Sequence, residues 1–265
     1  MKILIFWDIY WRIGRKAISK KIGELKEKYS PDFVIANVDN ATSWKWIIEK
    51  HALYFENLWV DLMTSWDHIF DNFEKIKEYL KKQDSKIIIP ANLYNNTEIW
   101  NKWYSILNKN WKKLLVIHLL DEIFMPHKVY NPFLKAAEII EKLKNEKLDW
   151  IIIDFHKEVS SSIYGMLYYL KNKVSFLYGT HTHIQANDDH IFDWVWIIND
   201  IWMTWPFNSV IWADYKTVKN RFLTGVNKWK IEQSLDKTFI LNAVFIEIEN
   251  FKTTKIEKIK IIDKL

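Results

Sequence analysis

Short apolar runs alternate along this chain with longer stretches in which apolar positions recur at three- or four-residue spacing. A short run bounded by turn residues is typical of a buried strand, and the recurring spacing is typical of an amphipathic helix. Strands are expected at KILIF, DFVIAN, VDLMTS, KIIIPAN, KLLVIHL, LDWIIIDFH, VSFLYGTHTH, VWIIND, FILNAVFIEIE and TKIEKIKII. Helices are expected at about 15–29, 47–57, 71–82, 132–146 and 159–170.

The order of these elements indicates an α/β protein whose sheets are covered by helices. Strands and helices alternate over most of the chain, whereas the last third is rich in strands, which predicts added antiparallel strands. No internal repeat, low-complexity tract or linker divides the sequence, so we expect one domain over residues 1–265. The segment MPHKVYNPF at 125–133 is the longest irregular stretch and is expected to form a surface loop.

The composition excludes several classes of protein. Hydrophobic residues make up 49% of the 265 residues and charged residues 27%, which is globular composition. No apolar run reaches the roughly 18 residues of a membrane helix, and MKILIFWD enters a strand without a signal-peptide pattern. The lack of cysteine excludes disulfides and thiolate metal sites, so we expect a cytoplasmic protein with no membrane partner.

Basic residues exceed acidic residues by a small margin. The chain has 38 Lys and Arg against 33 Asp and Glu, and its net charge is +5. Its lysines are mixed with Glu and Asp along helical faces, which predicts a solvated surface. We therefore expect no stable nucleic-acid partner, although a mild attraction for anionic small molecules remains. Assembly into a homo-oligomer is left open.

Glycine is scarce and tryptophan abundant. The chain has 5 Gly and 16 Trp, whereas average usage would give about 18 Gly. The segment NKNWKKLLVIHLL should be a hairpin in which Asn110 and Trp111 fill the turn, and a type I′ turn requires positive φ, which suits glycine. We interpret most of the tryptophans as glycines in the source organism, as happens where UGA is read as glycine. The alternative is a genuinely Trp-rich protein.

One expected strand after another ends in a side chain that can bind a metal ion. These side chains belong to Asp8, Asp39, Asn40, Asp67, His68, His156, His181 and His183. Sites in open α/β sheets lie beyond the carboxyl ends of the strands. Carboxylates, an amide and imidazoles without sulfur suit manganese, iron or zinc, and this many ligands can hold two ions that share a bridging carboxylate.

Each of these residues also has a simpler explanation when taken alone. Asp8 or Asp39 could cap a helix, His68 could lie on the surface, and His156 could bond to Asp154 at a strand end. Their recurrence at successive strand ends favours one shared site. The remaining histidines fit no strand-end pattern and are expected to be structural or surface residues, namely His51, His118, His127 and His190.

The motifs extend from one end of the chain to the other. They read WDIYW, VDN, WDH, DFHKE, GTHTH and DIWMTWP, followed by NSVIWAD and RFLTG. The sequence resembles the YmdB family of calcineurin-like metallophosphoesterases, bacterial phosphodiesterases whose pattern is GDI-x-G, GEN, GNH, DFHAE, GTHTH and DxGMTGP. Tryptophan stands at the family glycines at positions 7, 11, 66, 202, 205 and 212, and by the same interpretation at 44, 46, 59, 100, 103 and 111.

The resemblance implies a four-layer α/β/β/α sandwich and two divalent metal ions, iron or manganese, with zinc or magnesium as alternatives. It implies a first metal held by Asp8, Asp39, Asn40 and His183. It implies a second metal held by Asp39, Asp67, His156 and His181, with Asp39 as the bridge. His68 would be the general acid, and a hydroxide bridging the metals would attack the phosphorus. The implied substrates are small phosphodiesters, namely 2′,3′-cyclic and also 3′,5′-cyclic nucleotides.

Three positions depart from the family pattern. Asp39 replaces the usual Glu, Asp67 replaces the Asn of GNH, and Val38 replaces a Gly. The added charge of Asp67 should tighten cation binding and lower the Lewis acidity of the metal, which predicts a slower enzyme. Two alternatives therefore stay open: a phosphatase or nuclease of the same fold, and a regulator that binds metal and nucleotide with weak or no turnover.

Overall fold

A computed structural model describes residues 1–42, 47–66, 68, 73–94, 102–201, 203–226 and 230–265. Within these residues the strands form two sheets. The first sheet contains β1 (Lys2–Phe6), β2 (Phe33–Asn37), β3 (Leu62–Thr64), β4 (Ile87–Ile88), β11 (Trp205–Pro206), β12 (Thr238–Glu249) and β13 (Lys252–Lys264). The second contains β5 (Tyr104–Lys109), β6 (Lys112–Leu120), β7 (Trp150–His156), β8 (Phe176–Thr180), β9 (His190–Phe192) and β10 (Val195–Ile198).

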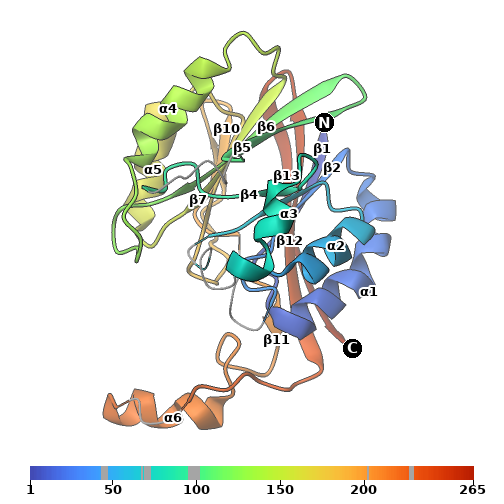
Figure 1. Cartoon of the computed structure of the whole chain (residues 1–265), viewed down its shortest axis with the longest axis vertical. Coiled ribbons are helices and arrows are strands. Elements are labelled where there is room, and N and C mark those ends of the chain that lie inside the picture. The colour runs from blue at the N-terminus through green and yellow to red at the C-terminus, as the bar shows by residue number, and fades with distance from the viewer. Residues whose placement is uncertain (43–46, 67, 69–72, 95–101, 202, 227–229) are drawn as a thin grey trace.

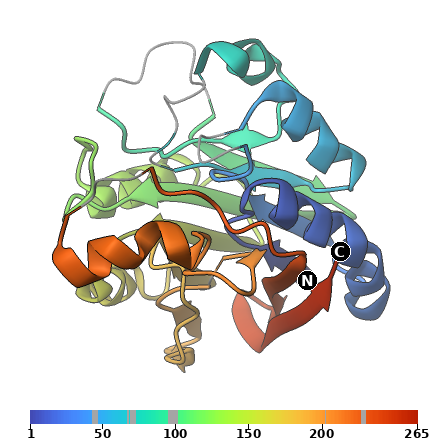
Figure 2. The ribbon, with the colours of Figure 1, turned by 90° about the horizontal axis from the view of Figure 1, so that it is seen from below.

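The two sheets pack against each other, and helices cover their outer faces (Figures 1 and 2). Helices α1 (Trp11–Tyr29), α2 (Glu49–Asn57) and α3 (Lys77–Lys81) lie on the side of the first sheet, and α4 (Pro132–Lys142) and α5 (Ser160–Leu170) on the side of the second. One apolar cluster joins the first sheet and its helices to the inner face of the second sheet, and another lies under α4 and α5. This is the four-layer α/β/β/α sandwich that the sequence predicted.

Parallel pairing places the carboxyl ends of several strands at the same edge. In the first sheet β1, β2, β3 and β4 run parallel in that order, and in the second β6, β7 and β8 run parallel. Strand β12 pairs with β1, β11 and β13 in antiparallel fashion, as the strand-rich last third predicted. The residues that follow β1, β2, β3, β7 and β8 therefore meet where the two sheets face each other.

The helix predicted over 71–82 is found in part. The described part of this segment has a 3₁₀ turn, η1 (Phe73–Lys75), and the short helix α3. Ile76, which lies between them and is buried, has φ of −127°, outside the helical range, so the segment does not form one continuous helix. Two other predicted helices differ from the observed ones by a few residues at one end. Helix α1 begins at Trp11 instead of residue 15, and α4 ends at Lys142 instead of residue 146.

Helix α6 (Tyr215–Thr224) was not predicted. It stands apart from the two-sheet body in Figure 1, and only Val218 among its residues is buried. Both of its ends are capped. The Asp214 side chain accepts a hydrogen bond from the Lys216 backbone nitrogen at 2.8 Å, and Gly225 ends the helix with φ of 70°.

The hairpin between β5 and β6 was predicted correctly. Asn110 and Trp111 fill its turn with φ of 53° and 64°, the sign that a type I′ turn requires. Positive φ also occurs at Trp11, Trp59 and Trp194, with values of 45°, 62° and 89°. Because an L-residue with a bulky side chain rarely takes this conformation, the backbone at these positions supports the glycine interpretation.

Candidate metal centre

Asp8, Asn40 and His183 come together from three different strand ends. The Asn40 Nδ2 donates to Asp8 Oδ1 at 2.8 Å, and His183 Nε2 lies 3.0 Å from Asp8 Oδ2. Asp8 is fully buried, while the His183 side chain keeps about a quarter of its surface exposed. These three residues belong to the set that the resemblance assigns to the first metal.

His156 and His181 form the second contact. His181 Nδ1 lies 3.0 Å from His156 Nε2, and the His156 ring is buried at the end of β7. On its other side His156 Nδ1 lies 3.0 Å from Thr180 Oγ1, so the hydroxyl orients the ring and directs Nε2 toward His181. Both histidines belong to the set that the resemblance assigns to the second metal.

Asp39 follows β2, which lies between β1 and β3 in the first sheet. Its carboxylate accepts a hydrogen bond from the Trp66 backbone nitrogen at 2.6 Å, which ties the end of β2 to the end of β3. Its own backbone nitrogen donates to Asn37 Oδ1 at 3.1 Å. His68 follows on the β3 side and is half-buried, and it is close enough to His156 to affect that ring electrostatically. Asp67 lies outside the described residues.

The backbone is strained at three of the predicted ligands. Asp8, His181 and His183 have φ of 30°, 110° and 63°, in a region that non-glycine residues seldom occupy. Strain of this kind costs about 1–3 kcal/mol per residue and is found mainly at functional sites. Two of these residues, Asp8 and His183, are in contact with each other, so strained backbone occurs on both sides of that contact.

The electrostatic environment keeps the imidazole of His156 neutral. Burial lowers its pKa well below the ordinary value, and the neighbouring histidines lower it further. A neutral imidazole is the form that binds metal ions, so no proton has to be displaced near neutral pH. His156 thus has the protonation state of a metal ligand.

The donor atoms are spaced as metal ligands would be. Nitrogen and oxygen ligands at about 2.1 Å from one ion lie about 3.0–3.4 Å apart for octahedral or tetrahedral angles. The His156–His181 and His183–Asp8 separations are both 3.0 Å. Among the described residues no three His, Asp or Glu side chains enclose a single point. The donors that meet here are carboxylate, amide and imidazole groups, which are the ligand types that divalent cations accept.

Two indoles crowd this cluster. The Trp66 ring stacks on the His156 ring with centroids 4.1 Å apart, and Trp7 contacts both Trp66 and Tyr178 at 5.7 and 4.8 Å. Both tryptophans are 1% exposed. With glycine at positions 7 and 66 the same backbone would leave open space beside the His156 ring.

Three residues that sequence reasoning passed over hold the ligands in place. Asp200 Oδ2 accepts from both the backbone nitrogen and the hydroxyl of Thr182 at 2.8 Å, which fixes the loop between the two THTH histidines. Glu158 Oε2 lies 2.9 Å from His181 Nε2, and Thr180 contacts His156. The signal was available, because Asp200 opens the motif DIWMTWP and Glu158 closes the motif DFHKE.

A glycine is essential at the end of β8. A Cβ at Gly179 would lie 1.9 Å from the Asn199 carbonyl oxygen, because β8 passes directly against the chain that leads to Asp200. Ile201 donates its backbone N–H to the Gly179 carbonyl at 3.2 Å. Close approach at this point keeps the THTH loop within reach of Asp200.

His118 has a structural role. Its Nδ1 lies 3.1 Å from Asp154 Oδ2, and both side chains are fully buried between the sheets. Burial raises the pKa of Asp154, and His118 opposes that rise. Asn37 donates to Thr64 at 3.1 Å on the facing sheet, so polar pairs in both sheets lie directly beneath the predicted metal ligands.

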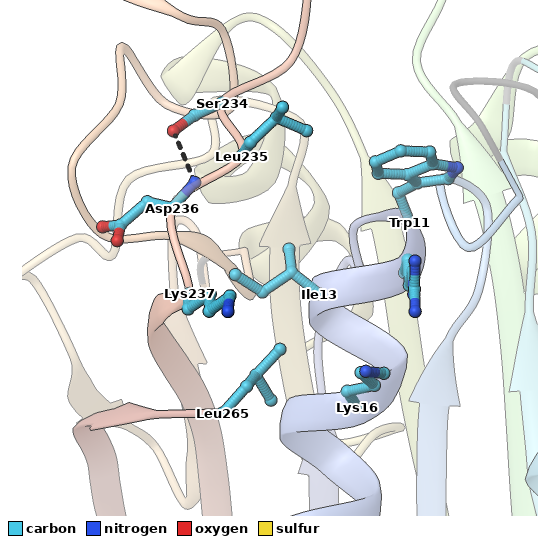
Figure 3. A pocket seen from close by; sticks show the side chains of 9 residues that line it. Trp11, Ile13, Lys16, Ser234, Leu235, Asp236, Lys237 and Leu265 are labelled. Carbon is cyan, nitrogen blue, oxygen red and sulfur yellow. Dashed lines mark hydrogen bonds between the residues drawn. The ribbon is translucent and has the colours of Figure 1, made fainter.

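A pocket adjoins the first ligand set. It has a volume of about 340 Å³ and lies between the first turn of α1 and residues 234–237 (Figure 3). Its lining carries charges of both signs, because Asp236 and the C-terminal residue Leu265 lie there with Arg12, Lys16 and Lys237. Trp11, which also lines the pocket, donates its backbone N–H to the Asn40 carbonyl at 2.8 Å.

Two facing sheets with carboxylate and imidazole side chains gathered at their carboxyl ends place the chain in the class of calcineurin-like metallophosphoesterases. The family described as YmdB-like protein matches residues 4–262, and the chain belongs to that family.

Relatives match the chain along nearly its whole length. The 2′,3′-cyclic-nucleotide 2′-phosphodiesterase of Bacillus subtilis is 32% identical to this chain, and the alignment covers 99% of this chain and 98% of the relative. The crystal structure of a phosphatase from Mycoplasma pneumoniae superposes with a TM-score of 0.89 at 29% identity, covering 100% of this chain and 94% of that one. A hypothetical protein of Thermus thermophilus has the same fold, with a TM-score of 0.88 at 23% identity, covering 99% of this chain and 100% of that one.

No helix in the described part of the chain is long and apolar enough to cross a membrane.

Proposed function

We propose that this chain is a metal-dependent phosphodiesterase that hydrolyses cyclic nucleotides, 2′,3′-cyclic ones and also 3′,5′-cyclic ones. The observation that carries the proposal is the pairing of predicted ligands into two contacts, Asp8–His183 and His156–His181. The name of the Bacillus subtilis relative and the family membership support the substrate class. We further propose a single domain over residues 1–265, located in the cytoplasm.

The proposed roles are those that the family resemblance assigns. Asp8, Asn40 and His183 would hold one divalent ion, Asp67, His156 and His181 would hold the other, and Asp39 would be a ligand shared by both. We propose iron or manganese, because the donors are oxygen and imidazole nitrogen without sulfur. When bound, two such ions supply an activated water and neutralise charge on the phosphate.

The residues around the ligands control proton positions. Thr180 fixes His156 Nδ1, and Glu158 contacts His181 Nε2, so each ring presents its remaining nitrogen in a defined direction. We assign the transfer of a proton to the leaving alkoxide to His68, which is half-buried and close enough to His156 to affect its pKa. Asp200 holds the loop that carries His181 and His183.

The test is hydrolysis of 2′,3′-cyclic AMP with manganese. The chain is expressed in two forms, one with its tryptophans and one with glycine at the family-glycine positions, and His68→Ala and His181→Ala serve as controls. We expect turnover by the enzyme and its loss in both control variants. Metal binding without turnover in either form would overturn the enzyme proposal.

The effect of the leaving group on the rate distinguishes whether His68 acts as a general acid or as a structural residue. A general acid contributes about 10²–10⁴-fold, and less where the leaving group is already a weak base. His68→Ala should therefore lose about 100-fold or more on cyclic AMP and much less on a p-nitrophenyl diester. Equal losses on both substrates would assign His68 a structural role.

A second candidate function is a metal- and nucleotide-binding regulator with little turnover. The observation that favours it is the Trp66 ring stacked 4.1 Å from the His156 ring, which covers one face of a predicted ligand. If the tryptophans are genuine, the printed chain should bind manganese and nucleotide but hydrolyse neither cyclic nucleotides nor phosphomonoesters.

A further inference from the structure

A second hollow lies beside the loop that follows β6. It has a volume of about 340 Å³, within the range of about 300–1,000 Å³ typical of small-molecule sites. Its lining consists of Tyr94, Glu122, Met125, Pro126, His127, Lys128 and Val129. None of these residues was assigned to the metal centre.

The hollow lies at the same edge of the sheet as the predicted ligands. Leu120, the last residue of β6, pairs with His156 on β7. The next residue, Asp121, donates its backbone N–H to the His156 carbonyl at 2.9 Å. The residue after Asp121 is Glu122, which lines the hollow. The lining of the hollow therefore begins two residues after Leu120, the β6 residue that pairs with His156.

The walls are fixed by one buried amide. Asn92 Nδ2 donates to the carbonyls of Leu120 and Tyr130 at 2.7 and 2.8 Å, and Asn92 Oδ1 accepts from the Leu120 backbone nitrogen at 3.0 Å. A bridge between Leu93 and Val129 completes the connection. Asn92 is fully buried, so the two segments that form the hollow are held together before any ligand arrives.

The lining combines one aromatic ring with apolar and polar groups. The Tyr94 ring belongs to the lining, and the Tyr130 ring, outside it, stacks on Tyr94 with centroids 4.3 Å apart and an interplanar angle of 13°. Both remain about half exposed, at 53% and 48%. Met125, Pro126 and Val129 supply apolar surface, while Glu122 supplies an acceptor for N–H groups. A planar aromatic ligand that carries N–H donors matches this chemistry.

We propose that this hollow binds the nucleobase of the substrate, with Tyr94 as the stacking platform and Glu122 as an acceptor for base N–H groups. The inference rests on the proposed function, because it names the part of the nucleotide that lies outside the metal centre. It assigns base recognition to the loop after β6 and leaves the phosphate to the ligands at the strand ends.

The first experiment compares two substrates that differ only in the base. These are 2′,3′-cyclic AMP and 1-O-methylribose 2,3-cyclic phosphate, both with manganese and the full-length chain. Loss of base stacking corresponds to about 5- to 150-fold in affinity. Tyr94→Ala should raise KM for cyclic AMP about tenfold, leave kcat similar, and leave KM for the abasic substrate unchanged.

Matched variants separate stacking from general damage. Tyr94→Phe keeps the ring and should behave as the parent chain. Tyr215→Ala removes a tyrosine of similar exposure, 56%, from helix α6, outside the hollow, and should change neither KM. An equal KM of the parent chain for both substrates, or an equal rise for both in Tyr94→Ala, would overturn the proposal.

A binding measurement without metal keeps this inference separate from the proposed function. Saturation-transfer NMR with adenosine and the metal-free chain requires no turnover. The base protons should receive more saturation than the ribose protons, and Tyr94→Ala should remove the difference. A parent chain that shows the difference but never hydrolyses cyclic AMP would refute the enzyme alone. A chain that hydrolyses cyclic AMP but shows no difference would refute the base site alone.

Discussion

Replacement of Trp111 by glycine should stabilise the protein. Trp111 occupies the β5–β6 turn with φ of 64°, and its side chain is 97% exposed. An L-residue in the left-handed region costs about 1–2 kcal/mol, whereas glycine pays no such cost but gains entropy in the unfolded chain. Because almost no apolar surface is lost with the indole, the net gain should be about 1 kcal/mol in the free energy of unfolding.

The assay is urea denaturation of the parent chain, Trp111→Gly and Trp111→Ala. Alanine removes the same indole but keeps the Cβ that causes the strain, so it should leave the free energy of unfolding nearly unchanged. The melting temperature of Trp111→Gly should rise by about 2 °C for a chain of this size. Equal stabilisation by alanine and glycine would show that the indole, and not the backbone conformation, was the cause.

Three further predictions concern the metals, the loop after β6 and the response to acid. Manganese at about 100 times its dissociation constant should raise the free energy of unfolding by about 2.7 kcal/mol per site. A chelator should reverse this stabilisation, and His183→Ala should weaken it. An unchanged melting temperature in the presence of manganese would count against cation sites. Asn92→Ala should cost about 3 kcal/mol in urea denaturation, because it removes three buried hydrogen bonds; a loss below about 1 kcal/mol would contradict this structural role. Burial lowers the pKa of His51 to about 4, so the unfolded chain takes up its proton first, and stability should fall as the pH drops from about 6.5 to 4. His51→Gln should lose less stability over this window, and identical profiles would contradict the assignment.

The strand positions were predictable because they depend on local apolar runs. KILIF, FVIAN and WIIIDFH appear as β1, β2 and β7 with fully or almost fully buried patterns. Chain order then indicated which polar residues would follow each strand. The sequence could not indicate helix α6, because its length of chain has a weak apolar pattern and its capping residues are short-range signals.

The strand-end pattern predicted that these residues would lie near one another, but it could not predict their contacts. The strand-end pattern identified His156 and His181, whereas the orienting contact of Thr180 and the double hydrogen bond of Asp200 depend on how β8 passes the segment after β10. Hydrogen bonds between segments distant in sequence leave no periodic signal. The stacking of Trp66 on His156 is likewise a property of the folded chain.

The central position of β12 affects the order in which the protein can be completed during synthesis. Strand β1, which leads to Asp8, pairs with β2 on one side and with β12 on the other, and the Met1 amino group reaches Ile248 across 247 positions. At about 5–20 residues per second, a ribosome needs on the order of tens of seconds to deliver β12 after β1 has emerged. During that interval one edge of β1 has no strand partner, so the first sheet can be completed only after β12 has been synthesised.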